Sequence, residues 1–242
     1  MISKSRLKYI QSLGQKKHRD DEGVFIAEGP KLVQELLQNA KGELVDLYAL
    51  NEWKQSNENI FTGININEIS ESELSRISQL KTPNQVVGLF KQFKRTNPET
   101  KGKISLVLDT VQDPGNLGTI IRTADWFGIS QVICSPDSAD LYNPKVVQAT
   151  MGSIARVKVF YVGLDGWLKQ QAVRIYGALL GGKDVTKMSR LKDGLIIIGN
   201  ESKGIDENLL PHINEKITIP KSGEVESLNA AVATGIILSY LV

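Results

Sequence analysis

Residues 195–205 read LIIIGNESKGI, and this stretch predicts the fold class. Four successive apolar residues suit a strand that is buried on both faces, as in a parallel sheet covered by helices. The strand leads directly into Gly199, and Glu201 follows two residues later. Glycine at a strand end lets a ligand approach the backbone closely, although a simple turn would explain it equally well. Because ligands bind at the carboxyl ends of strands in open α/β sheets, the stretch also predicts a binding site.

Similar apolar runs on either side extend the predicted sheet. The candidate strands are Ile104–Asp109, Gln131–Ser135, Arg156–Val162, Arg174–Leu180, Leu195–Asn200 and Lys216–Pro220. Helices fit between several of them, at Leu117–Phe127, Pro144–Met151 and Leu164–Gln171, and a last helix is predicted at Leu228–Leu241. This alternation predicts an α/β domain built on a parallel sheet.

The first part of the chain alternates in the same way on a smaller scale. Strands are predicted at Val24–Glu28, Leu44–Leu50 and Gln85–Phe93, and helices at Lys4–Leu13, from Pro30 and from Ser70. Ser70 and Glu73 have the spacing of a capping box, which marks the start of a helix.

A polar stretch separates the two parts. Residues 91–103, KQFKRTNPETKGK, carry Pro98 and Gly102 and have the composition of a linker. We therefore predict a small α/β domain at residues 1–95, a linker at residues 96–103 and a larger domain at residues 104–242.

Charge is distributed unevenly along the chain. The net charge is only +2, yet residues 1–19 hold six cations and no acid: Lys4, Arg6, Lys8, Lys16, Lys17 and Arg19. A second basic stretch contains Lys91, Lys94, Arg95, Lys101 and Lys103. Such clusters suit a polyanion, and a solvated terminus and linker are the competing explanation.

Several classes of protein are disfavoured by what the sequence lacks. A single cysteine, Cys134, excludes an intramolecular disulfide and lies in an apolar run that predicts burial, and the two histidines give no metal-ligand cluster. The N-terminus lacks the apolar stretch of a signal peptide. The apolar tract Ala230–Val242 is shorter than the roughly 20 residues that span a bilayer. We expect a cytoplasmic protein without a membrane segment or a metal.

Two further strands are followed by loops that contain more polar residues than a simple turn requires. In residues 108–124, LDTVQDPGNLGTIIRTA, a helix begins near Asn116, and Arg122 follows on roughly the same face as Asn116. A helix cap and a surface arginine would also explain this stretch. In residues 217–235, ITIPKSGEVESLNAAVATG, Ser227 is positioned to cap a helix of small residues, which leaves Asn229 without a capping role. Neither G-x-G-x-x-G nor a P-loop occurs, which counts against dinucleotide and P-loop enzymes.

Together, and in this order, the three loops resemble the three motifs of the SpoU/TrmH family, RNA 2′-O-methyltransferases of the SPOUT superfamily. The matching positions are Asn116, Arg122, Gly199, Glu201, Gly204, Ile219, Pro220, Ser227, Leu228 and Asn229. The segment 25–33, FIAEGPKLV, is similar to the family's small RNA-binding domain, which resembles a ribosomal protein. The sequence departs from the family pattern at Ser202 and Lys203 and at Lys221, beside the matching positions.

The resemblance implies a fold, a cofactor and an assembly. The C-terminal domain would contain a trefoil knot, a rare exception to normal chain topology. S-adenosylmethionine would be gripped largely by backbone groups around Leu179, Gly181, Ile198, Gly199, Ile219 and Leu228. The protein would act as a homodimer with the active site near the interface, and the reaction would need no metal.

The resemblance also assigns roles to side chains. Arg122 would be the catalytic residue, with Asn116, Glu201, Ser227 and Asn229 holding it and the ribose in place. Arginine seldom gives up its proton, so clamping a phosphate and stabilising alkoxide charge is the simpler role for Arg122. The N-terminal domain would contact RNA phosphates through Lys4, Arg6, Lys16, Lys17, Arg19 and Lys31.

The expected activity is methylation of a ribose 2′-hydroxyl, with ribosomal RNA favoured over transfer RNA by the extra N-terminal domain. Three alternatives stay open at this point. One is a transfer RNA 2′-O-methyltransferase, another is a non-catalytic RNA-binding or ribosome-assembly protein on the same fold, and the third is a small-molecule α/β enzyme.

Overall fold

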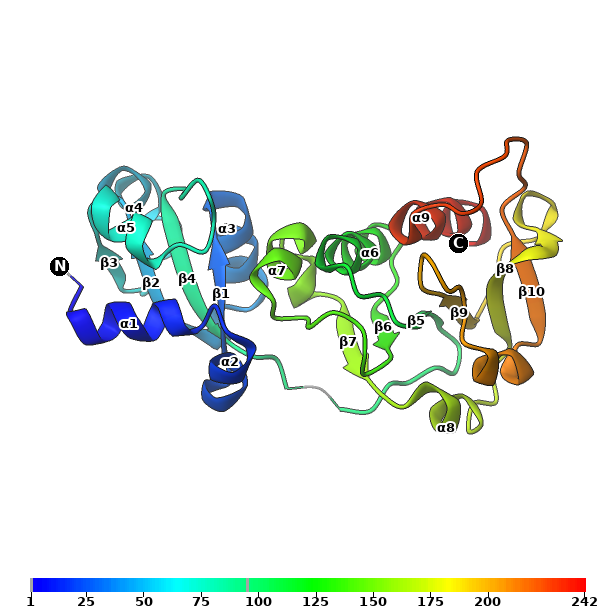
Figure 1. The fold of residues 1–242 in the computed structure, drawn as a ribbon. Helices are drawn as coiled ribbons and strands as arrows, with labels where there is room; N and C mark the ends of the chain where they lie inside the picture. Colours follow the sequence, from blue (N-terminus) through cyan, green and yellow to red (C-terminus); the bar gives the residue numbers. More distant parts are fainter. Residues whose placement is uncertain (1, 95) are drawn as a thin grey trace. The chain divides into compact units, whose positions relative to one another are not determined.

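The computed structural model describes residues 2–94 and 96–242 (Figure 1). Met1 lies outside the described residues, and so does Arg95, which belongs to the second basic stretch. The chain divides into two compact units. The first contains residues 2–94 together with residues 140–155, and the second contains residues 96–139 and 156–242.

The second unit is built on a six-stranded parallel sheet with the strand order β10-β8-β9-β5-β6-β7. Its strands are β5 (Ile104–Leu108), β6 (Gln131–Cys134), β7 (Lys158–Tyr161), β8 (Ile175–Asp184), β9 (Gly194–Ile198) and β10 (Glu215–Thr218). The predicted parallel sheet is confirmed. Each predicted strand is found, because near-continuous apolar runs such as Leu195–Ile198 are buried on both faces.

Helices cover both faces of this sheet. They are α6 (Pro114–Trp126), α8 (Leu164–Leu168) and α9 (Ala230–Leu241), with short 3-10 turns η3 (Val185–Lys187) and η4 (Glu207–His212). Helices α6 and α9 lie side by side, and α8 lies on the opposite side of the sheet (Figure 1). α8 and η4 pack on the sheet through a buried cluster that includes Val107, Ile197, Leu164 and Leu209.

The first unit contains a mixed four-stranded sheet with the order β1-β4-β2-β3. Its strands are β1 (Val24–Glu28), β2 (Leu44–Ala49), β3 (Ile66–Glu68) and β4 (Val86–Lys91). Its helices are α1 (Lys4–Ser12), α2 (Lys16–Glu22), α3 (Pro30–Asn39), α4 (Asn51–Asn57), α5 (Glu71–Ile77) and α7 (Pro144–Thr150), with 3-10 turns η1 (Lys41–Glu43) and η2 (Ser153–Ala155). The capping box predicted at Ser70 and Glu73 is present.

Three elements of this unit were not predicted, namely α2, α4 and β3. Helix α2 reads KKHRDDE and has no apolar stripe, so nothing in its periodicity marks it. Helix α4 buries Trp53 as its one apolar anchor, and β3 is only three residues long. These elements depend on their neighbours rather than on their own pattern.

Residues 140–155 pack with the first unit, although they follow β6 in the sequence. Helix α7 contacts β1, and the Tyr142 ring lies 5.0 Å from the ring of Phe25, centroid to centroid. Arg19 is 2% exposed, and its guanidinium donates to Asp140 Oδ2 at 2.6 Å and to the carbonyl oxygens of Leu13 and Gly14. A buried charge that is paired in this way fixes the segment to α1 and α2.

Candidate active site

The carboxyl ends of β5, β6 and β9 are joined by hydrogen bonds that fix the adjoining loops. The Asn200 side chain donates to the Thr110 carbonyl at 2.9 Å, and the Thr110 amide donates to Ser135 Oγ at 2.8 Å. The Asp206 amide donates to Asp109 Oδ2 at 2.7 Å. Thr110 has a φ of 55°, a strained value for a β-branched residue, and these bonds hold it there. The sequence did not single out Asn200 or Asp109, although both are polar residues at strand ends.

Three loops that are distant in the sequence meet at this edge. The Asn116 Nδ2 atom donates to a carboxylate oxygen of Glu201, and Asn229 Nδ2 donates to Asn116 Oδ1 at 2.9 Å. Ser227 Oγ lies 3.4 Å from the carbonyl oxygen of Glu201. The structure therefore brings together four of the five predicted catalytic side chains in a chain of polar contacts.

The N-terminal caps of α6 and α9 lie at this edge, and one of them differs from the prediction. Asp113 caps α6 by accepting from the Asn116 amide. Asn229 caps α9, with its Oδ1 accepting from the amides of Ala231 and Val232 at 3.0 and 3.3 Å. The predicted cap, Ser227, is wrong because the helix begins only at Ala230, and Ser227 precedes it by three residues. Asn229 performs both tasks, since its Oδ1 caps α9 while its Nδ2 contacts Asn116.

Arg122 lies apart from this cluster. It sits in the middle of α6 with an exposed side chain, and within residues 2–94 and 96–242 it has neither a hydrogen bond nor an ion pair. The residue predicted to be catalytic is therefore a free cation on the outer face of the helix whose first turn carries Asn116. It is available to an anionic ligand without the cost of breaking an existing pair.

The predicted cofactor residues belong to or follow three adjacent strands, β10, β8 and β9, and Leu179 and Gly181 lie within β8 itself. In the register of β8 with β10, Lys216 is opposite Gly177 and Ile217 is opposite Lys183. Residues 178–182 therefore bulge out of the pairing, and they contain Leu179, Gly181 and the 73% exposed Leu180. Gly181 has a φ of 72°, which favours glycine.

The remaining cofactor positions lie at the neighbouring strand ends. Ile198 ends β9, and a Cβ at Gly199 would collide with the backbone of Gly204 and Ile205, so only glycine fits this tight turn. Ile219 follows β10, and Leu228 is 46% exposed just before α9. Leu180 and Leu228 are exposed and Ile219 is half-buried, so these ends present apolar surface that suits the adenine ring of a cofactor.

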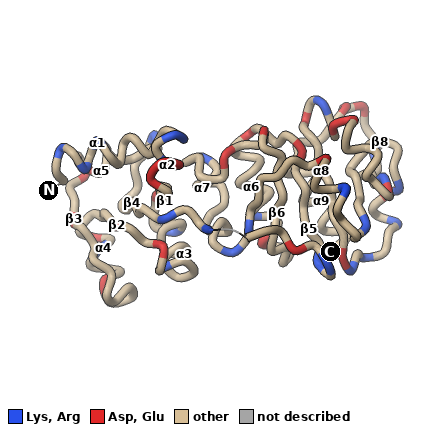
Figure 2. The backbone as a smooth tube through the Cα atoms, turned by 90° about the horizontal axis from the view of Figure 1, so that it is seen from below, with Lys and Arg blue, Asp and Glu red and all other residues tan. Residues whose placement is uncertain are grey.

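The cations predicted to contact RNA divide into two sets. Lys4, Lys17 and Lys31 are exposed and have no ion pair in the part of the chain that the structure describes. Three others are paired: Arg6 with Asp46, Lys16 with Asp20, and the buried Arg19 with Asp140. Lys and Arg are spread over both units (Figure 2), so charge alone marks no single face.

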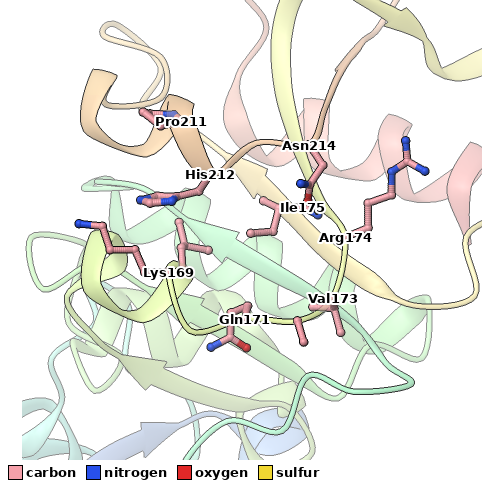
Figure 3. Close-up of a pocket in the computed structure, with 10 residues that line it drawn as sticks. Lys169, Gln171, Val173, Arg174, Ile175, Pro211, His212 and Asn214 are labelled. Atoms are coloured by element: carbon pink, nitrogen blue, oxygen red, sulfur yellow. Dashed lines mark hydrogen bonds between the residues drawn. The ribbon is translucent and has the colours of Figure 1, made fainter.

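A cavity of about 590 Å³ lies at the opposite, amino ends of β8 and β10 (Figure 3). His212 Nε2 and Lys169 Nζ both bind the Asp165 carboxylate, at 2.8 and 2.7 Å, and Arg174 pairs with Glu215 at 2.8 Å. The polar side chains of Lys169, His212 and Arg174 already have partners, and none of the predicted site residues lines the cavity. It is therefore a weaker candidate than the carboxyl ends of the strands.

Two negative findings concern the described residues only. Among them, no three His, Cys, Asp or Glu side chains are grouped so as to hold a metal ion. No helix in the same residues is long and apolar enough to cross a membrane. Cys134 is buried, as predicted, and burial raises the pKa of its thiol.

Comparison with known proteins supplies the remaining findings. Residues 103–239 match the SpoU rRNA Methylase family, and residues 4–88 match an MRM3-like substrate binding domain. The Bacillus subtilis 23S rRNA (guanosine(2553)-2′-O)-methyltransferase RlmP is 32% identical over 240 residues, which cover 98% of this chain and 95% of that protein. The Xanthomonas axonopodis 23S rRNA (guanosine-2′-O-)-methyltransferase RlmB is 36% identical over 55% of each chain.

Solved structures match over the whole chain as well. A TrmH-family RNA methyltransferase structure from Porphyromonas gingivalis has a TM-score of 0.89 at 37% identity and covers 99% of this chain and 98% of its own. An AdoMet-bound rRNA methyltransferase from Sinorhizobium meliloti has a TM-score of 0.83 at 33% identity, with coverage of 98% and 95%. The similarity thus extends through both units.

Proposed function

Because the chain belongs to the SpoU rRNA methylase family, as its three loops predicted, we propose that it methylates a ribose 2′-hydroxyl of ribosomal RNA. The family is one of S-adenosylmethionine-dependent RNA methyltransferases, and both the enzyme class and the cofactor predicted from the sequence are confirmed. The observation that carries the proposal is the contact of Asn116, Glu201 and Asn229 across three family motifs.

Ribosomal RNA is the proposed substrate because full-length similarity leads there. The relative from Bacillus subtilis that spans 98% of this chain is a 23S rRNA enzyme, and its match includes the N-terminal domain. A transfer RNA substrate is the alternative, and the test below separates the two.

The bound cofactor supplies a methyl group on a positively charged sulfur, which an oxygen nucleophile can attack in line. In our proposal the bulge at residues 178–182, Ile198 and the turn at Gly199 hold it through backbone groups, with the side chains of Ile219 and Leu228 against its apolar parts. Asn116, Glu201 and Asn229 orient the ribose, and Ser227 steadies the Glu201 loop. Positioning of this kind supplies on the order of 7–11 kcal/mol in favourable cases.

Arg122 is proposed to clamp the RNA phosphate beside the target ribose and to stabilise the negative charge that develops on the 2′-oxygen. A guanidinium offers five donors in a planar fork that matches a phosphate. The exposure of Arg122, together with its lack of a partner among the described residues, leaves this fork available.

We propose that the enzyme is a homodimer and that residues 104–242 form a trefoil knot, both by family membership. The outer face of α9 supports the dimer. Val232 and Tyr240 are 51% and 46% exposed on a helix whose other face is buried. A second copy covering this apolar stripe would place its own residues near Leu228 and thus near the proposed site.

The N-terminal domain, with the boundary at residues 96–103, is proposed to deliver the RNA. Lys4, Lys17 and Lys31 are suited to phosphate contacts because they are exposed, whereas Arg6 and Lys16 would have to exchange their pairs with Asp46 and Asp20 for a phosphate. Arg19 is omitted because its buried guanidinium already binds Asp140 and two carbonyl groups.

The test is transfer of labelled methyl from S-adenosylmethionine to unmodified ribosomal RNA and transfer RNA in separate reactions. Digestion of the product identifies the labelled nucleoside. We expect a 2′-O-methylnucleoside from the ribosomal pool. Label from the transfer RNA pool alone would overturn the substrate, label on a base would overturn the ribose assignment, and no label would favour a non-catalytic RNA-binding protein.

A further inference from the structure

The last turn of α6 carries a tryptophan that the chain leaves in solvent. Trp126 is 84% exposed, whereas Trp53 is 3% exposed and Trp167 packs partly on the sheet. Within the described residues Trp126 takes part in no ring stacking and no cation–π contact. An aromatic ring this large gains much from burial, so its exposure points to a ligand from outside the chain.

The neighbours of Trp126 on the helix indicate what kind of ligand this is. Thr119, Arg122 and Trp126 are all exposed and follow one another at spacings of three and four residues, so they form one stripe. Side chains at such spacings have Cβ atoms roughly 5–6 Å apart. The stripe combines a polar, a cationic and an aromatic side chain, which is the combination that contacts phosphates and stacks on bases in single-stranded nucleic acids.

The acid next to Trp126 does not oppose an anionic ligand. Asp125 Oδ2 accepts a hydrogen bond from Arg156 Nε at 2.9 Å and forms an ion pair with Arg156 Nη2 at 2.8 Å. The guanidinium compensates the carboxylate, and Arg122 adds a free positive charge one turn away. The surroundings of the ring are therefore favourable to a polyanion.

We propose that Trp126 stacks on an unpaired base of the substrate RNA and holds that strand alongside Arg122. The inference rests on the proposed function, because it gives the RNA methyltransferase a contact that reads an unpaired segment. Aromatic rings next to arginine are a common platform for single-stranded RNA, since every base has a face that can stack. Trp126 would bind and orient RNA without taking part in the methyl transfer.

Tryptophan fluorescence of the full chain tests this directly. The probes are single-stranded poly(U) and the poly(A)·poly(U) duplex, without cofactor. We expect poly(U) to quench the emission more strongly than the duplex does. The quench should vanish in Trp126→Phe and persist in the matched control Trp167→Phe. A quench that survives in Trp126→Phe, or none in the wild type, would overturn the proposal.

Methyl transfer to a ribosomal RNA transcript gives a second readout. Trp126→Ala should raise KM for RNA about ten-fold, within the range that base–aromatic stacking supplies, while kcat and cofactor affinity stay near those of the wild type. Trp126→Phe should keep most of the RNA affinity. If sedimentation showed that Trp126→Ala changes the association state, Trp126 would be a contact between copies and the stacking proposal would be wrong.

The two proposals fail separately. If the wild type and Trp126→Ala methylate ribosomal RNA equally well, the proposed function stands and the stacking proposal is wrong. A protein that methylates no RNA, yet shows the Trp126-dependent quench by poly(U), retains the stacking and loses the proposed function.

Discussion

The two ends of the parallel sheet differ in how their polar groups are used. At the carboxyl ends, Asn116 bonds to both Glu201 and Asn229, which come from two other loops, and Arg122 farther along α6 is left without a partner among the described residues. At the amino ends, a cavity of about 590 Å³ is lined by Lys169, His212 and Arg174, which already bind Asp165 or Glu215. The cavity is therefore not the proposed active site, because an active site needs converging polar groups that are still free to bind a substrate.

The largest effect should come from Arg122. Arg122→Lys keeps the charge but loses the planar fork, and we expect turnover to fall by about 10²–10³, as for loss of a group that stabilises transition-state charge. Cofactor affinity should stay nearly unchanged. The measurement is single-turnover methyl transfer with calorimetric titration of S-adenosylmethionine. Lys169→Ala, at the amino end, is the matched control and should leave turnover intact; normal turnover in Arg122→Lys would remove this residue from the mechanism.

The next prediction compares two glycine-to-alanine substitutions, one at each end of the sheet. Gly199→Ala puts a methyl group against the backbone of Gly204 and Ile205, which cannot move aside as a side chain can. We expect a loss of about 1–3 kcal/mol in the free energy of unfolding, as in overpacked sites, and weaker cofactor binding. Gly166→Ala in α8 meets no atom within 4 Å and should be neutral or slightly stabilising. The measurement is urea unfolding of both variants. Equal free energies of unfolding would contradict the prediction that the turn at Gly199 has no room for a side chain.

The two roles of Asn229 can be separated by substitution. Asn229→Ser keeps a side-chain oxygen that caps α9 but loses the amide that contacts Asn116. Its stability should stay near that of the wild type while turnover falls about ten-fold, the size of one lost hydrogen bond in a positioning network. Asn229→Ala should also lose about 1 kcal/mol of stability with the cap. If Asn229→Ser turned over normally, the residue would be a cap and nothing more.

Much of the second unit could be predicted because its information is local. Apolar runs fixed the six strands, and the parallel direction of those strands brought the polar loop residues to one edge. The register bulge at residues 178–182 could not be foreseen, since it depends on how β10 pairs with β8. Nor could the capping role of Asn229, because the helix start depends on where the extended chain turns.

Arg19 shows why charge patterns are weaker predictors than apolar ones. In the sequence it belongs to a basic run, yet in the structure it is buried against Asp140, a residue 121 positions away. A cation's partner is set by tertiary structure, and no local pattern distinguishes Arg19 from its exposed neighbour Lys17. Trp126 is the converse case, in which helical periodicity alone places an aromatic side chain on the same face as Arg122.

The smallest expected effect is at the amino end, in the contacts of Asp165. Hydrogen bonds from Lys169 and His212 hold the pKa of this carboxyl below its usual value. A depressed pKa in the folded state means that the stabilisation is present above the unfolded-state pKa of about 3.9 and is lost as the pH falls below it. Asp165→Asn should therefore lower Tm slightly at neutral pH, and the difference from the wild type should shrink on acidification. Turnover should not change, and a large loss of methyl transfer in this variant would show that the two ends of the sheet are coupled after all.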